Sequence, residues 1–432
     1  MVQPEGDESD HAAADGRHAA TSAPQRDGRV LLPALGLALG AAVALGLARF
    51  SYSLLLPPMQ ADLGWNYAQA GMLNTANAVG YLVGAIAAAA VGRAFGTRRS
   101  VAGGMVVAIV ALAAAAFTPN FALQLLLRLV AGFGSALTFV GGAALVAKLG
   151  DRSPRRSGLL LSLYTGGAGI GILVSGLLVP PLLAIHGPTG WHAGWIGLAI
   201  LAAASLAAVV PALRGVPDPD PPQPSTSDAH RSGVLRPLLL PGFGYLLYGA
   251  GYIAYMTFVV SYLADDGFSR GQVTLFWTVL GASVVAGVPV WGRVLDRLRS
   301  GYALALLNIA LVAGAVLALA ASGMVAGMAS AVVFGSAFMA VPAGMAHVAR
   351  RRLPSSAWAA GISAVTSAFA IGQSIGPGLA GILSDSEGGA GIGLVVAMIL
   401  LGTATLVYLL VELAASRRRP VTEQPEPAFA VD

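Results

Sequence analysis

The feature that most constrains this chain is a succession of long apolar segments between residues 30 and 415. About twelve of them reach the ~20 residues that an α-helix needs to cross the hydrocarbon core of a bilayer. Only 10% of the 432 residues are charged, whereas the fraction in soluble domains is about 25%. We therefore predict an all-α membrane protein with twelve transmembrane helices.

An internal repeat divides the predicted helices into two sets. The segment VGRAFGTRRS (91–100) recurs as WGRVLDRLRS (291–300), and LGLARFSYSLLLPPMQADLGW (45–65) aligns without gaps on residues 248–268. Duplicated transporters have this organisation, with a substrate site near the midplane between the halves. We predict two pseudo-symmetric six-helix bundles. The predicted parts are a disordered cytoplasmic tail at 1–29, the first bundle at 30–213, a Pro-rich cytoplasmic linker at 214–237, the second bundle at 238–415 and a cytoplasmic tail at 416–432.

The distribution of basic residues predicts the topology. If the N-terminus is cytoplasmic, the predicted cytoplasmic segments contain 22 of the 25 Lys and Arg residues. The exceptions are Arg49, Arg128 and Arg270. Arg270 falls in a predicted outer loop, and the other two fall inside spans. We therefore expect a multi-pass protein of the bacterial cytoplasmic (inner) membrane with both termini in the cytoplasm.

Arg49 is the most unusual residue of the first span. An arginine at the centre of a membrane helix costs roughly 2.5 to 3.5 kcal/mol, and no Asp or Glu lies well inside any predicted span. Arg49 must therefore use carbonyls, hydroxyls, amides, water or an anionic ligand. It can anchor a carboxylate or phosphate through two parallel hydrogen bonds, or it can fix helix packing. The missing carboxylate also argues against proton coupling by an embedded acid, which leaves uniport, exchange, or protonation of the substrate or of a flanking group such as Asp62.

Tyrosines recur along the seventh span, at residues 245, 248, 252 and 255, so they share one face of a helix. In the repeat alignment Tyr252 corresponds to Arg49, which predicts that the two face each other at matching depth across a central cavity. An aromatic stripe is equally consistent with packing. With further polar side chains, the candidate substrate-binding residues are Arg49, Tyr52, Asn74, Asn77, Gln124, Arg128, Tyr248, Tyr252, Tyr255 and Gln373.

Glycines crowd the fifth and eleventh predicted spans, for example at Gly166, Gly167, Gly169 and Gly171 in the fifth. Small residues let helix backbones approach closely. A sliding interface between the halves and static packing are both consistent with this pattern.

Several motifs resemble those of the major facilitator superfamily, over residues 30–415. RLVAGFGSA (128–136) resembles the fourth-helix motif, which implies a structural or gating role for Arg128. GRVLDR (292–297) matches the second-half loop motif, which implies that Asp296 and Arg297 latch a cytoplasmic gate. The first-half copy, GRAFGTRR (92–99), contains Arg93 but lacks the usual aspartate. LYTGGAGIGILVSGLLVP (163–180) and AFAIGQSIGPGLAGIL (368–383) resemble the YbfB/YjiJ-type branch.

The resemblance implies a secondary transporter that works by alternating access. Two buried arginines favour a small organic anion as the substrate, and the alternatives are efflux of drug-like or sugar-like compounds and a membrane sensor without transport. The chain has no cysteine, HExxH motif or phosphate loop, and its histidines lack metal-ligand spacing, so we expect no enzyme, cofactor or metal. The expected partners are a small-molecule substrate and the lipid bilayer, with no nucleic acid, and we expect a monomer.

Overall fold

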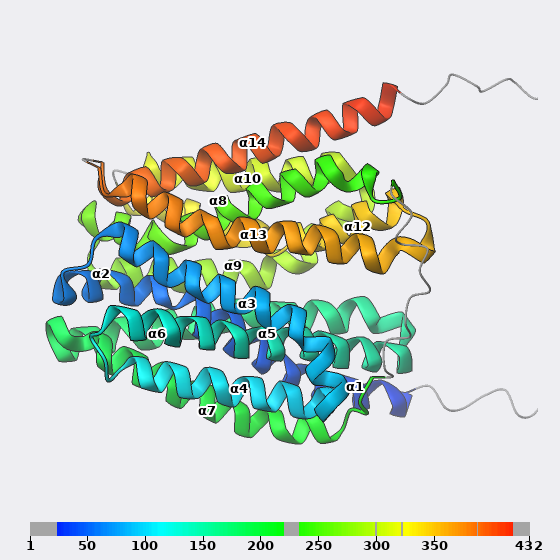
Figure 1. Ribbon diagram of the computed structural model, residues 1–432, viewed down its shortest axis with the longest axis horizontal. Coiled ribbons are helices and arrows are strands. Elements are labelled where there is room, and N and C mark those ends of the chain that lie inside the picture. The colour runs from blue at the N-terminus through cyan, green and yellow to red at the C-terminus, as the bar shows by residue number, and fades with distance from the viewer. Residues whose placement is uncertain (1–23, 220–232, 299, 321–322, 387, 418–432) are drawn as a thin grey trace, which may run out of the picture.

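Figure 1 shows the computed structural model, which describes residues 24–219, 233–298, 300–320, 323–386 and 388–417. In these ranges the regular secondary structure is helical, and the long helices run side by side along one axis of the molecule (Figure 1). Eleven segments of the described residues are long and apolar enough to cross a membrane. One of them, Pro154–Arg214, contains two long helices. The expected all-α membrane fold with twelve spans is confirmed.

The first half of the molecule begins with a span made of three helical pieces. The tail predicted at 1–29 is helical from Pro24, and residues 1–23 lie outside the described residues. The first span consists of α1 (Pro24–Ala41), the π-helix η1 (Ala42–Phe50) and α2 (Tyr52–Leu63). The other helices of this half are α3 (Tyr67–Phe95), α4 (Thr97–Ala115), α5 (Phe121–Arg152), α6 (Ser157–His186) and α7 (Gly190–Arg214).

The second half also contains six spans, one of which is divided. Residues 220–232 of the predicted linker and residues 418–432 of the predicted tail lie outside the described residues. The helices α11 and α12 belong to one span. The second half contains α8 (Leu239–Asp265), α9 (Arg270–Arg297), α10 (Ser300–Leu319), α11 (Met324–Phe338), α12 (Val341–Arg352), α13 (Trp358–Ser384) and α14 (Gly389–Arg417).

The turns between the first two spans of each half match in the register of the sequence repeat. Gly64 after α2 and Gly267 after α8 have φ values of 67° and 87°, which favour glycine because it has no Cβ. Asn66 and Ser269 then begin the next helix, and each forms a capping box with a glutamine three residues later. The two halves therefore share turn chemistry as well as helix order.

The two ends of the helix bundle differ in charge. The helix α1 begins and α14 ends at the same end, on the right in Figure 1. The turn between α3 and α4 lies there too, beside Arg93, Arg98 and Arg99, and we call this end the basic end. The opposite end, where α2 ends and α3 begins, is called the far end below.

The glycine-rich helices α6 and α13 lie close to the backbones of neighbouring helices, both within a half and between the halves. In α6, Gly167 lies against the backbone of Ala38 in the same half, whereas Gly169 lies against the backbone of Gly281 in α9 of the other half. In α13, Gly381 lies against the backbone of α3. The glycines therefore serve packing within a half and close contact between the halves.

We expect Gly167→Ala to destabilise the protein and Gly166→Ala to leave it nearly unchanged. A methyl group at Gly167 would overlap the carbonyl of Ala38, whereas one at Gly166 would meet no neighbouring atom within 4 Å. Overpacking of this kind costs about 1–3 kcal/mol. Thermal unfolding of the purified variants in detergent measures the difference, and equal melting temperatures would contradict the close approach of α1 and α6.

Candidate substrate cavity

A cavity of about 430 Å³ lies between the two halves, with η1, α3, α5 and α6 on one side and α8, α12 and α13 on the other. Its volume is within the range of sites for small organic molecules. The lining part of α3 extends from Tyr81 to Ile86, and that of α8 from Tyr245 to Tyr252. These segments run from the middle of each helix toward the basic end, so the cavity occupies the basic half of the molecule.

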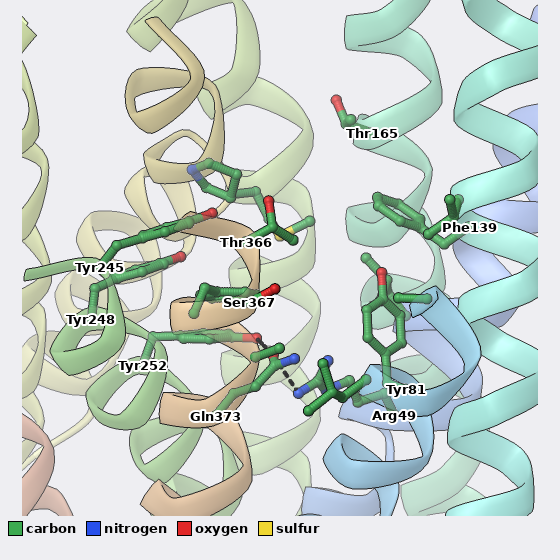
Figure 2. A pocket seen from close by; sticks show the side chains of 18 of the residues that line it. Arg49, Tyr81, Phe139, Thr165, Tyr245, Tyr248, Tyr252, Thr366, Ser367 and Gln373 are labelled. Atoms are coloured by element: carbon green, nitrogen blue, oxygen red, sulfur yellow. Dashed lines mark hydrogen bonds between the residues drawn. The ribbon is translucent and has the colours of Figure 1, made fainter. Parts of the chain in front are cut away.

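The two walls of the cavity differ in chemistry. On the second-half wall, the rings of Tyr245, Tyr248 and Tyr252 form a stack, with centroid distances of 5.6 and 5.0 Å between neighbours. Figure 2 shows that their hydroxyl groups point toward the cavity. The first-half wall is mainly apolar and includes the side chains of Leu82 and Phe139. Apart from Arg49, Tyr81 and Thr165, a ligand would thus meet hydrocarbon on the first-half side and more hydrogen-bonding groups on the second-half side.

Arg49 forms the base of the cavity and is 2% exposed. Its Nη2 donates a hydrogen bond of 2.7 Å to Oε1 of Gln373, and the hydroxyl of Tyr252 donates to the same oxygen at 3.1 Å (Figure 2). The guanidinium carbon also lies 5.4 Å from the ring centroid of Tyr81, within the range of a cation–π interaction. Arg49 and Tyr252 therefore lie at the same depth, and Gln373 connects them across the two halves.

The base of the cavity has more hydrogen-bond donors than acceptors. Nε of Arg49 and Nε2 of Gln373 are buried and have no hydrogen-bond partner. Among the described lining residues there is no aspartate or glutamate. Two unsatisfied donors, one of them on a cation, thus lie beside a cavity without an anionic acceptor.

Arg128 is held in a different way from Arg49. Its Nη1 donates to the carbonyl of Ala48 at 2.7 Å, and its guanidinium carbon lies 4.7 Å from the ring centroid of Tyr52 and 5.7 Å from that of Trp195. It does not line the cavity. These partners belong to the first half, so Arg128 stabilises packing within that half.

The predicted binding residues separate into two groups. Those that line the cavity are Arg49, Tyr248, Tyr252 and Gln373. Those that are buried outside it are Tyr52, Asn74, Asn77, Gln124, Arg128 and Tyr255.

The residues outside the cavity form hydrogen bonds within their own half, except Asn74, which bonds to Thr257 of the other half. Gln124 donates to the carbonyls of Ala115 and Thr118 at 2.7 Å, and the hydroxyl of Tyr255 lies 2.6 Å from that of Ser330. Asn77 donates to the carbonyl of Arg128 at 3.1 Å.

The residues predicted to form the gate lie at the basic end. Arg93 and Arg297 are exposed near the ends of α3 and α9. The side chain of Asp296 lies outside the described part of the chain.

Several lining residues were not predicted from the sequence. Tyr81 follows Asn77 by four residues and therefore shares its helix face, a spacing that could have identified it. Ser367 and Phe369 precede Gln373 on α13, where the glycines dominated the interpretation. Thr165 of α6 is a hydroxyl among glycines and gave no comparable signal.

The halves are joined at the far end. Asn74 donates to the hydroxyl of Thr257 at 2.6 Å, Ser53 donates to the carbonyl of Thr257 at 3.0 Å, and Trp277 donates to Ser175 at 3.1 Å. In the described part of the chain, the side-chain hydrogen bonds between the halves lie at the cavity base or on its far side. The structure is therefore a conformation sealed at the far end, with the cavity on the basic side of the seal.

Two six-span halves with a cavity between them define a membrane transporter of the major facilitator type. The chain belongs to the family described as "Uncharacterised MFS-type transporter YbfB", which matches residues 41–409. The resemblance seen in the sequence is confirmed, and the proteins of this family and its structural neighbours are transporters rather than enzymes.

Known proteins support the same fold. A bacterial homologue of the human lysosomal transporter Spinster, in an inward-facing and unoccupied conformation, has a TM-score of 0.67 at 16% identity, over 93% of this chain and 100% of that one. The nucleoside transporter NupG has a TM-score of 0.66 at 14% identity, over 91% and 99%. A chloramphenicol resistance protein of Streptomyces lividans is 29% identical over 265 residues, which are 60% of this chain and 65% of that protein, less than two thirds of its length.

We expect Gln373→Glu to raise the melting temperature and Gln124→Glu to lower it. The first change places a carboxylate where Oε1 already accepts from Arg49 at 2.7 Å, and it removes an unpaired donor. A hydrogen bond to a charged group contributes about 1.5–3 kcal/mol. The second change places a carboxylate against the carbonyls of Ala115 and Thr118, without a cation to balance it. Thermal unfolding tests both, and a destabilised Gln373→Glu variant would contradict an acceptor deficit at the base.

Proposed function

We propose that this transporter moves a small organic anion, such as a carboxylate, through the cavity by alternating access. The observation that carries the proposal is the pair of buried donors without partners, Nε of Arg49 and Nε2 of Gln373. A carboxylate has two acceptor oxygens and a negative charge, and a guanidinium binds it in a planar, two-bonded geometry. Such a ligand would supply the hydrogen-bond acceptors and the negative charge that the base lacks.

The walls support a substrate with an apolar part. With its carboxylate at Arg49, the rest of the ligand would extend toward the basic end, between the tyrosine stack and the apolar side chains around Phe139. The hydroxyl groups of Ser367 and Thr366 lie along that path (Figure 2). Opening of the far-end seal and closure of the basic end would then expose Arg49 to the other side of the membrane.

A second candidate function is the efflux of drug-like compounds. The relative from Streptomyces lividans is a chloramphenicol resistance protein, and the tyrosine stack beside Phe369 offers an aromatic wall to an uncharged ligand. This alternative predicts binding that does not depend on the charge of Arg49. The sugar-like alternative predicts the same independence.

Substitutions at Arg49 distinguish these functions. We expect Arg49→Gln to abolish carboxylate binding and to leave folding nearly intact, because it removes a charge that is costly to bury and keeps hydrogen-bonding capacity. Arg49→Lys should restore binding in part, since an ammonium lacks the planar fork. Tyr252→Phe should weaken binding by about 0.5–1.5 kcal/mol through the loss of one neutral hydrogen bond. A panel of small carboxylates, screened by thermal stabilisation of the purified protein, identifies the ligand to be measured.

The matched control is Arg128→Gln. It removes the hydrogen bond to Ala48 and the ring contacts within the first half, so it should lower the melting temperature. Flux of the labelled carboxylate into liposomes then shows transport. Unchanged ligand affinity in a folded Arg49→Gln variant would reject the anion anchor and favour the neutral or drug-like substrate.

We further propose that the basic end faces the cytoplasm of a bacterial cell, with both termini and the linker on that side of its inner membrane. The positive-inside rule supports this orientation. Because the chain has no cysteine, single cysteines can report on it. A cysteine at Thr189, exposed in the far-end turn between α6 and α7, should react with an impermeant maleimide in intact cells, whereas one at Ser227 in the linker should not. Labelling of Ser227→Cys from outside would reverse the topology.

A further inference from the structure

The two helices that form most of the second-half wall, α8 and α13, run in the same direction, from the basic end to the far end (Figure 1). Their backbones are in close contact at two points. A Cβ at Gly372 would overlap the carbonyl of Leu246, and one at Gly376 would overlap the carbonyl of Ala250. The two contacts are four residues apart on both helices, so α8 and α13 advance together along the cavity.

This register places polar side chains of both helices at two matching levels. Tyr252 and Gln373 share a hydrogen bond beside Arg49, and we call this the base level. Tyr245 precedes Tyr252 by seven residues, and Thr366 precedes Gln373 by the same number. Seven residues are about two turns, so Tyr245 and Thr366 lie about 10 Å nearer the basic end. Both line the cavity above Tyr252 and Gln373 in Figure 2, and we call them the upper level.

The hydroxyl groups of the upper level are available to a ligand. Elsewhere in the lining, the hydroxyl of Tyr248 donates to a backbone carbonyl of α11, and that of Ser367 donates to a carbonyl of its own helix. In the described part of the chain, the hydroxyls of Tyr245 and Thr366 have no hydrogen-bond partner in the protein. The other lining hydroxyls of which this is true are those of Tyr81 and Ser363. Water or a ligand must therefore bond to the upper level.

The opposite wall between the two levels is apolar. Leu82, Ala85 and Ile86 follow Tyr81 along α3 toward the basic end, and Phe139 of α5 lies above Tyr81 in Figure 2. A ligand that reaches from the base level to the upper level would therefore need an apolar middle part.

We propose that the substrate is a hydroxy acid, with a carboxylate at one end, a hydroxyl group about 10 Å away and an apolar frame between them. This inference rests on the proposed function, because the carboxylate binds at Arg49. The ligand hydroxyl meets Tyr245 and Thr366, and it can pair with either because hydroxyl groups both donate and accept. A ligand with hydrocarbon at that place would displace water from the two hydroxyls and leave them unpaired, which lowers its affinity. Tyr245 and Thr366 thus select hydroxylated acids.

The test compares two rigid, extended acids that differ only in one hydroxyl, para-hydroxycinnamate and cinnamate. Isothermal titration calorimetry of the detergent-purified protein at neutral pH measures both, because there the carboxylates are ionised and the phenol is protonated. We expect para-hydroxycinnamate to bind about two- to tenfold more tightly, the effect of one net hydrogen bond. The shorter pair, para-hydroxybenzoate and benzoate, should show no such preference. An equal preference in the shorter pair would place the hydroxyl contact below the upper level and overturn the proposal.

Substitutions then assign the preference. The double variant Tyr245→Phe with Thr366→Val keeps the shape of both side chains and should reduce the affinity ratio of the two cinnamates to about one. The matched control is Tyr248→Phe, which removes a hydroxyl that already donates to a carbonyl and should keep the ratio. Both affinities of a ratio are measured on the same variant, so a general loss of packing cancels.

The outcomes separate this inference from the proposed function. A ratio of about one in the unmodified protein, or a ratio kept in the double variant, would overturn the hydroxy-acid proposal. The anion anchor would stand in either case if Arg49→Gln abolished cinnamate binding. No binding of para-hydroxycinnamate, with another carboxylate of the panel bound through Arg49, would also overturn the inference alone. Binding of both cinnamates that survives Arg49→Gln would reject the anion anchor and this inference with it.

Discussion

The hydrogen bond from Arg49 to Gln373 joins the two halves at the deepest point of the cavity, and the geometry of the candidate site depends on it. It places a cation, an amide and the hydroxyl of Tyr252 around one oxygen. It also leaves Nε of Arg49 and Nε2 of Gln373 without acceptors. A ligand at the base would therefore compete for the guanidinium and amide groups that hold the halves together.

The two buried arginines illustrate how context changes the role of a residue. Arg128 directs its guanidinium to a carbonyl and two aromatic rings of its own half. Arg49 lies in the π-helix η1, and its partner belongs to the opposite half. Short π-helical segments occur often at functional sites because they break the regular helical ladder. The same residue type thus stabilises one bundle in the first case and connects both bundles in the second.

Much of the fold was predictable because it depends on local pattern. Segment length and hydropathy defined the spans, and the repeat aligned Arg49 with Tyr252 at the depth where the structure has them. The inward location of Arg128 and Tyr255 was also predictable, but their exclusion from the cavity was not. A helix face can point at a cavity or at a neighbouring helix, and only the packed structure distinguishes the two. The hydrogen bond from Arg49 to Gln373 depends on a contact between segments that are distant in the sequence, so no local pattern indicates it.

The contact of Gly169 with Gly281 has a consequence for the rate at which the halves can move. Where two backbones meet without side chains between them, a relative rotation does not force buried side chains to change rotamer or to separate and repack. Each immobilised side chain that must be reordered adds an entropic contribution of up to about 2 kcal/mol, and glycine adds none. At this point neither glycine has a side chain to reorder, whereas Val284 and Trp277 of α9 pack against α6 nearby. Rotation about this contact therefore has a smaller entropic penalty than rotation about a contact between two long side chains.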